Sequence, residues 1–191
     1  MDLSIVTGAG SVISNVLDYT KWIKALLNTS GPISKAGYKA LLTSRSILEK
    51  GDEPGPFTGP ETYALGWFTG TYQGYEYFTH SGGMEAFGAE VIFFPALNYG
   101  IVSLGNTAST SNAVELRLMW HLVDEKIGVP KEKRFDWNKK YHIPFSFPWS
   151  LLMNSTATWT LSRECRRDIV TRLRLSTQQY QILRSLPASH C

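Results

Sequence analysis

The sequence predicts an α+β domain of the α/β sandwich type, in which helices pack on an antiparallel sheet. The main observation is the stretch from Tyr63 to Asn106, which contains four extended runs rich in aromatic and β-branched residues. Glycines and one proline separate these runs at the short spacing of an antiparallel meander. Side chains alternate along a strand, and the run 87–94 is mostly apolar on both faces. This indicates a sheet covered by helices on both sides.

The chain before the sheet predicts two helices. Ser14 or Asn15 can cap the first one, and Asp18 would then lie near the positive end of the helix dipole. A second, shorter helix is predicted from Ser34 to Leu42. The apolar stripe of the first helix, which ends near Asn28, is formed by Val16, Tyr19, Ile23, Leu26 and Leu27.

The segments on either side of the sheet differ in character. The loop 51–61, GDEPGPFTGPE, is predicted to lack regular structure, because it holds three prolines and three glycines. A loop of this length beside a sheet is either disordered or a functional lid, and both alternatives stay open. After the sheet, residues 107–110 are predicted to cap a helix that runs to about Gly128. Its apolar face consists of Val114, Leu118, Met119, Leu122 and Val123.

The tail from His142 differs in composition from the rest of the chain. It has six arginines against two acidic residues and no glycine, whereas residues 1–141 have thirteen basic and fourteen acidic residues. We therefore predict two parts, a domain over residues 1–141 and a divergent basic tail over residues 142–191. The tail is predicted to be poorly ordered beyond about Pro144, as a solvated helix or as a stretch that was never selected to fold.

Charge and hydropathy point to few partners. The formal net charge of +3 is too small to predict nucleic acid or a membrane as a partner. No apolar run reaches the roughly 18 residues of a membrane span, and the first residues do not resemble a signal peptide. The sequence predicts no metal and no cofactor, and a cytoplasmic location is expected.

One short motif has catalytic character. His80-Ser81-Gly82-Gly83 follows the second extended run, where two glycines allow a ligand to approach the backbone and expose its amides. A neighbouring histidine can donate a hydrogen bond to an oxyanion or a carboxylate. A hairpin with a histidine present by chance would look the same, so the motif alone decides nothing.

The order of several motifs gives the tetrapeptide its context. Between about Gly8 and Trp137 the chain resembles the second half of the serine β-lactamase and penicillin-binding-protein-like family, above all its class C, esterase and transesterase branch. The motifs are GAGSVIS, DYTKWIKALLN, YALGW, HSGG, a strand that ends in FFP, YGIVSLGN and a long final helix. The resemblance implies acyl-transfer chemistry on a small-molecule ester, lactam or other acyl substrate.

The resemblance also implies roles for single residues. His80 takes the place of the basic residue on the strand beside the catalytic serine, and Ser81 supplies the neighbouring hydroxyl. Gly82 leaves room for substrate, and Gly83 offers the second amide of an oxyanion hole. By their position nearby, Trp67 and Tyr72 are expected to line an acyl pocket together with the loop 51–60.

The chain departs from the family pattern in two motifs. The family takes its nucleophile and base from Ser-x-x-Lys and has a second motif, Tyr-x-Asn or a close relative. No serine of this chain has lysine three positions later, and no tyrosine has asparagine two positions later. The chain is therefore expected to be the carboxy-terminal half of such an enzyme and to be inactive alone. Two alternatives stay open, a non-catalytic binding or regulatory module and a truncated product without a biochemical role.

The resemblance and the two apolar stripes also predict how the helices pack. We expect the helices that begin near Asn15 and Ser109 to lie together on one face of the sheet. The other face would then be uncovered, and exposed apolar area of this kind predicts self-association.

Overall fold

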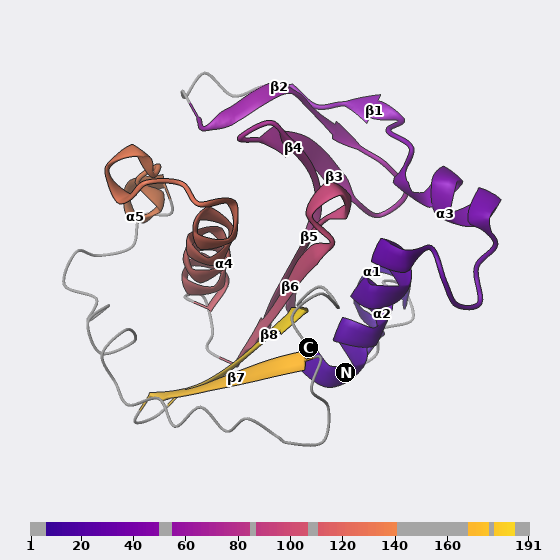
Figure 1. Ribbon diagram of the computed structural model, residues 1–191. Coiled ribbons are helices and arrows are strands. Elements are labelled where there is room, and N and C mark those ends of the chain that lie inside the picture. The colour runs from indigo at the N-terminus through magenta and orange to yellow at the C-terminus, as the bar shows by residue number, and fades with distance from the viewer. Residues whose placement is uncertain are drawn as a thin grey trace.

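The computed structural model describes residues 7–49, 55–84, 87–106, 111–140, 168–175 and 178–185, and its centre is an antiparallel sheet (Figure 1). The strand order is β1-β2-β3-β4-β5-β6-β8-β7, so strands that follow one another along the chain pair side by side as far as β6. Helices precede and follow these strands, which confirms the predicted α+β class. The strands are β1 Ser46–Ile47, β2 Phe57–Tyr63, β3 Phe68–Tyr72, β4 Tyr75–Met84, β5 Phe87–Phe94, β6 Tyr99–Gly105, β7 Asp168–Leu175 and β8 Gln178–Ser185.

Tight turns connect β3 to β4 and β5 to β6. Gln73 and Gly74 join β3 to β4 with φ angles of 50° and 83°, as a two-residue turn with two left-handed positions requires. The short 3-10 helix Pro95–Leu97 joins β5 to β6 and ends at Asn98 with φ of 44°. The four extended runs of the sequence thus become β3 to β6.

The prediction that residues 51–61 lack regular structure is wrong for the second half of that loop, because β2 begins at Phe57. Its pairing with β3 shifts register between Thr58 and Thr62. Gly59 adopts a φ of 76° in this irregular stretch, which also contains Pro60. A bulge near the edge of a sheet tolerates glycine and a residue without an N–H, so the residues that argued against a strand lie where a strand accepts them.

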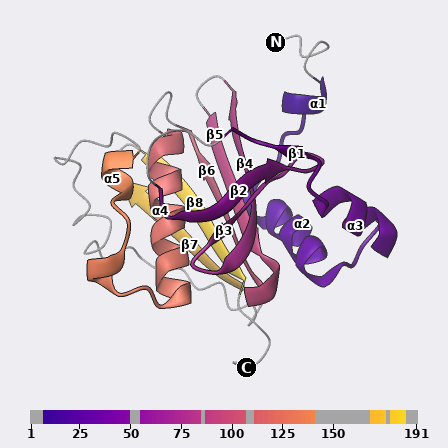
Figure 2. The same ribbon diagram turned by 90° about the horizontal axis from the view of Figure 1, so that it is seen from above.

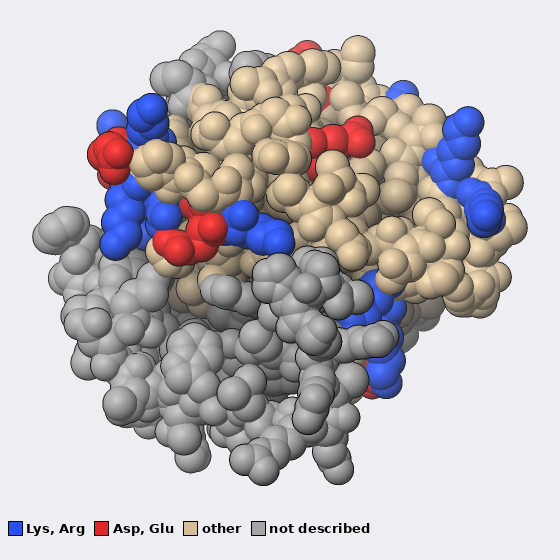
Figure 3. All heavy atoms as spheres, in the orientation of Figure 1, with Lys and Arg blue, Asp and Glu red and all other residues tan. Residues whose placement is uncertain are grey.

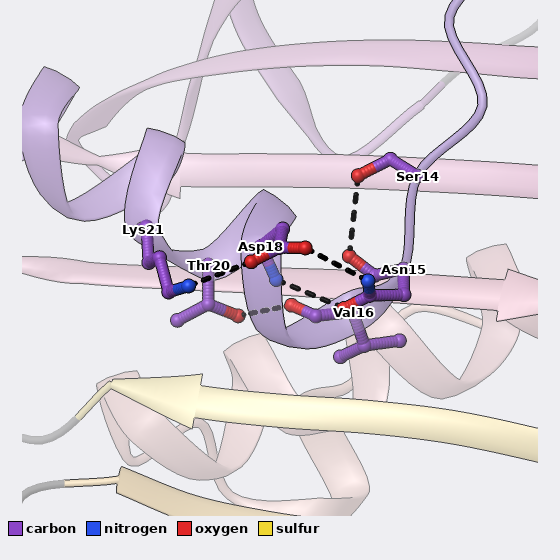
Figure 4. Close-up of polar contacts among 6 residues, drawn as sticks. All are labelled: Ser14, Asn15, Val16, Asp18, Thr20 and Lys21. Carbon is purple, nitrogen blue, oxygen red and sulfur yellow. Dashed lines mark hydrogen bonds and ion pairs between the residues drawn. The ribbon is translucent and has the colours of Figure 1, made fainter.

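The helix α2 (Val16–Asn28) begins where the sequence predicts. Asn15 is its N-cap: the side-chain oxygen accepts from the backbone N–H of Asp18 at 3.0 Å (Figure 4). The Asp18 carboxylate in turn accepts from Asn15 Nδ2 at 2.9 Å and from Lys21 Nζ at 2.6 Å. The first of these contacts satisfies a first-turn N–H that has no partner inside the helix.

The helices cover both faces of the sheet, and α2 and α4 (Ser111–Ile127) lie on opposite faces (Figure 1 and Figure 2). Ile23 of α2 belongs to one buried cluster with Phe93, whereas Val123 of α4 belongs to another with Ile92 and Phe94. Alternate residues of β5 thus point to different helices. The remaining helices are α1 Thr7–Gly10, α3 Lys35–Leu42 and α5 Trp137–Lys140.

This arrangement corrects the expectation that both helices share one face. The apolar stripes were predicted correctly, but a stripe shows which side of a helix is buried and not which face of a sheet it covers. The uncovered face on which self-association was predicted is therefore absent from the described residues. Self-association itself stays a prediction.

Of the tail, the structure describes residues 168–175 and 178–185, and the lack of order beyond about Pro144 stays a prediction. Residues 168–185 contain β7 and β8, and β8 pairs with β6 from Ile101↔Arg184 to Leu104↔Gln181. A ladder between strands uses backbone groups, so it forms without the periodic apolar pattern that the tail lacks. Residues 141–167 lie outside the described residues.

Charged side chains are unevenly placed on the described part of the face that Figure 3 shows. In the orientation of Figure 1, acidic and basic side chains mix at the side where α5 lies, and the upper part of the same face has few charges (Figure 3). Arg134 Nη2 pairs with Glu125 Oε1 at 2.7 Å. In the part of the chain that the structure describes, no helix has the length and apolar character needed to cross a membrane.

Candidate functional site

The two halves of β4 have different surroundings. Residues 75–79 pair with β3 on one side, and their pairing ends at Phe68↔Thr79. From His80 to Met84 the described pairing is with β5 alone. We call these five residues of β4 the open edge. Here the strand becomes accessible: His80 is half-buried, and Ser81, Gly82 and Gly83 are exposed.

The ring of His80 is held by two hydrogen bonds. Its Nδ1 lies 2.6 Å from the backbone oxygen of Ser81, which can only accept, so Nδ1 carries a proton. In the neutral ring Nε2 then accepts from the Tyr63 hydroxyl at 3.1 Å. Phe68 packs against the ring with a centroid distance of 5.5 Å. The site thus presents a histidine of defined orientation and tautomer.

Ser81 is not placed to use this histidine as a base. Neighbouring residues of a strand point to opposite faces. Tyr77 belongs to the cluster on the α4 face and Phe78 to the cluster on the α2 face, so alternation directs Ser81 to the α4 side and His80 to the α2 side. His80 bonds to the backbone of Ser81, not to its hydroxyl.

The glycines of the motif are not explained by the fold. Neither Gly82 nor Gly83 has a positive φ angle. A Cβ added at Gly82 would meet Ala89 Cβ at 3.4 Å, and one at Gly83 would meet Asn112 Oδ1 at 3.7 Å, both ordinary contacts. Among the described residues, neither turn geometry nor packing requires glycine at the open edge.

Two residues that the sequence analysis did not assign to the site lie directly beside it. Asn112, in the first turn of α4, donates from Nδ2 to the backbone oxygen of Gly82 and to Glu90 Oε1, both at 2.9 Å. Glu90 is only 1% exposed. Burial raises the pKa of this carboxyl to about 8, against the lowering effect of the hydrogen bond from Asn112. In the sequence, Glu90 could have been noticed as the single acidic residue of an otherwise apolar strand.

A second buried carboxyl lies on the α4 face. Glu115 of α4 is fully buried, and burial raises its pKa to about 7. Within the described residues neither of its carboxylate oxygens has a hydrogen-bond partner, and the same holds for the hydroxyl oxygen of Ser103. The charge of Glu115 also contributes to the raised pKa of Glu90, so the two carboxyls interact across the interface between helix and sheet.

The two aromatic residues expected to line an acyl pocket belong to the core instead. Trp67 is 5% exposed and lies in the cluster on the α2 face, against Phe93 with a ring-centroid distance of 5.0 Å. Tyr72 is fully buried in the cluster on the α4 face, where its hydroxyl donates to Asp124. They lie on opposite faces of the sheet, so they do not share one pocket. The structure brings only His80 and its three neighbours together at the open edge.

Comparisons with known proteins show which family the chain belongs to. A model of the beta-lactamase family matches residues 1–124. The chain is 44% identical over 137 residues to unguisins hydrolase ungD' of Aspergillus campestris. This alignment covers 71% of this chain and 25% of that protein. It is 39% identical over 150 residues to unguisins hydrolase ungD of Aspergillus violaceofuscus. This second alignment covers 71% of this chain and 26% of that protein.

The chain thus spans about a quarter of the length of these two curated relatives. No solved structure is significantly similar to it. The family model covers more than half of the chain, and two hydrolases of this kind match most of it. The chain belongs to the beta-lactamase family.

Proposed function

We propose that this chain supplies the oxyanion strand of a serine acyl hydrolase of the beta-lactamase family, acting on a small-molecule ester, lactam or other acyl compound. The observation that carries the proposal is the pair Gly82-Gly83, which is exposed at the open edge although neither turn geometry nor packing requires glycine there. An oriented histidine beside such a pair fits a strand that contacts a substrate.

Each residue of the motif has a role in this proposal. The backbone N–H of Gly83 donates to the substrate oxygen that becomes negatively charged in the tetrahedral intermediate. Gly82 lets the acyl group approach the strand. His80, as the basic residue of the family motif, and the hydroxyl of Ser81 bind polar groups of the substrate.

According to the same proposal, this chain alone does not turn over a substrate. Nucleophile and base act as a unit in serine acyl transfer, and without them only about 10³ to 10⁴ over the reaction in water remains from oxyanion donors and binding. This sequence contains neither Ser-x-x-Lys nor Tyr-x-Asn. Ser81 and His80 do not replace them, because their side chains point to opposite faces. A second segment or chain must then provide the nucleophile.

Mass spectrometry tests the proposal directly. The purified chain is incubated with a fluorophosphonate serine-hydrolase probe and, separately, with a β-lactam. We expect no covalent adduct with either. One stoichiometric adduct on any serine would contradict the proposal, since it would reveal a nucleophile that is not part of the family pattern.

A complementary experiment tests the positive half. When a segment that carries Ser-x-x-Lys and Tyr-x-Asn is fused ahead of Gly8, esterase or acyl-transfer activity is expected. His80→Ala in that fused protein should lower kcat/KM, whereas His121→Ala is a matched control away from the open edge and should change it little. An equal decrease of kcat/KM in the two variants would show that His80 has no specific role in the site.

A further inference from the structure

We propose that Asn112 and Glu90 are positioning residues that hold the Gly82–Gly83 peptide group, so that the N–H of Gly83 points out of the open edge. The inference rests on the proposed function, in which this N–H is an oxyanion donor. It adds two residues, one from α4 and one from β5, that touch no substrate and act on the site through the backbone of β4.

The first step is the orientation of the Asn112 side chain. A side-chain amide nitrogen carries two hydrogens. Here one donates to the Gly82 oxygen and the other to Glu90 Oε1, each over 2.9 Å. Both partners accept, so the nitrogen and not the oxygen of the amide must face them. The other end of the amide lies over the neighbouring glycine, 3.7 Å from the place of a Cβ at Gly83.

The second step is the geometry of the peptide group. In a planar trans peptide the C=O of one residue and the N–H of the next point in opposite directions. Gly82 pairs with Ala89 of β5, and Asn112 links the Gly82 oxygen to Glu90 of the same strand. The Gly82 carbonyl is therefore held toward β5. The N–H of Gly83 must point to the other side, where β3 no longer pairs with β4.

The third step concerns Glu90, which anchors the Asn112 side chain. We call the two hydrogen bonds from Asn112, to Gly82 and to Glu90, the clamp. Glu90 lies opposite Ser81 of β4 and Ser103 of β6 in the sheet register, and its side chain is almost completely buried. Such a side chain does not swing into solvent, so it fixes the amide that bonds to it. Two consecutive glycines are the most mobile dipeptide in a chain. An oxyanion donor must be oriented before the reaction, and the clamp adds to the order that pairing with β5 gives these two glycines.

Nuclear magnetic resonance of the full chain labelled with ¹³C and ¹⁵N tests the clamp without any turnover. In the unmodified chain we expect a scalar coupling across the hydrogen bond between Asn112 Nδ2 and the Gly82 carbonyl carbon. The N–H of Gly83 should have an order parameter of about 0.85, as in a rigid backbone. Asn112→Ala should lower it below about 0.6, while the amides of Ile92 and Val123 in the core keep their values.

Two further variants separate positioning from general stability. Asn28→Ala is the matched control, because the Asn28 side chain also donates to a backbone oxygen, that of Lys24 at 2.9 Å, but at the end of α2. It should leave Gly83 unchanged. Glu90→Gln keeps an acceptor oxygen and should preserve the order of Gly83, whereas Glu90→Ala should lose it.

An unchanged order parameter at Gly83 in folded Asn112→Ala would overturn the inference. If that variant does not fold, the coupling in the unmodified chain decides, and its absence would equally overturn the clamp. These outcomes are independent of the proposed function. A covalent adduct on the unmodified chain would refute the proposed function and leave the order of Gly83 as measured.

Discussion

The two faces of the sheet are covered by buried clusters that differ in residue type. The cluster on the α2 face is mostly apolar, with Ile23 and Leu26 packed against Phe78 and Phe93. The cluster on the α4 face is larger in aromatic content and is accompanied by three buried acidic residues: Glu90, Glu115 and Asp124. Both faces hold a helix on the same strands, yet among the described residues only the α4 face buries carboxyl groups.

This difference separates two sources of stability. Apolar packing depends little on pH, so the α2 face should contribute the same free energy in acid and in mild alkali. Burial of a carboxyl disfavours its charged form. The α4 face should therefore weaken as protons are lost. The face that carries the Asn112 clamp is also the face that responds to pH.

The largest expected effect is the loss of the aromatic stack on the α4 face. Trp120 is 3% exposed and stacks on Trp137 with a ring-centroid distance of 4.7 Å and an angle of 11°. Trp120→Ala leaves a large cavity and should lower the free energy of unfolding by about 3–5 kcal/mol. Urea denaturation measures this change. Ile23→Val on the α2 face is the smaller comparison, with an expected cost of about 0.5–1.5 kcal/mol, and an equal loss in both variants would contradict the comparison.

The second effect is the pH dependence of the α4 face. The folded-state pKa values of Glu90 and Glu115, about 8 and about 7, lie above the ordinary 4.5. At these two carboxyls the folded chain thus holds more protons than the unfolded chain between pH 4.5 and 8, so their contribution to the free energy of unfolding should decrease as pH rises through this range. Each pKa unit corresponds to about 1.4 kcal/mol, which gives Glu115 a share of up to about 3 kcal/mol.

Urea denaturation at pH 5 and pH 8.5 measures this share. Glu115→Gln should reduce the difference between the two pH values. Glu132→Gln, in the exposed 3-10 helix Lys131–Lys133, is the control and should leave the difference as it is. The comparison fails if the unmodified chain is at least as stable at pH 8.5 as at pH 5.

The smallest effect concerns the cap of α2 (Figure 4). Asn15→Ala removes the acceptor for the Asp18 N–H and should cost about 1 kcal/mol. Because the change lies on the α2 side, this cost should be equal at pH 5 and pH 8.5. Thermal unfolding at both pH values measures it. A cost that varied with pH in step with that of the α4 face would show that the two faces are coupled.

The local parts of the fold could be read from the sequence. Asn15 and Ser34 each supply an oxygen to a first-turn N–H, and this depends only on residues three positions away. The meander from β3 to β6 followed from alternation and from breakers such as Gly74. Alternation also directs Ser81 and His80 to opposite faces.

What required three-dimensional contacts was missed. Pro60 argues against a strand in a sequence, and only the register shift against β3 makes it acceptable. Trp67 and Tyr72 are neighbours along the chain, but they lie on opposite faces of the sheet. Asn112 bonds to residues 22 and 30 positions earlier, so no local pattern could connect it to the glycines.

The pairing of β8 with β6 has a consequence for the order in which the chain folds. The strand β6 ends at Gly105 and β8 ends at Ser185, so 80 residues are synthesised between them. At about 5–20 residues per second this takes roughly 4–16 seconds on the ribosome. During that interval β6, whose side chains are nearly all buried in the finished sheet, has an unpaired edge. A nascent chain of this protein therefore offers a template for strand addition, and it is most exposed to wrong pairing or to chaperones before its tail has emerged.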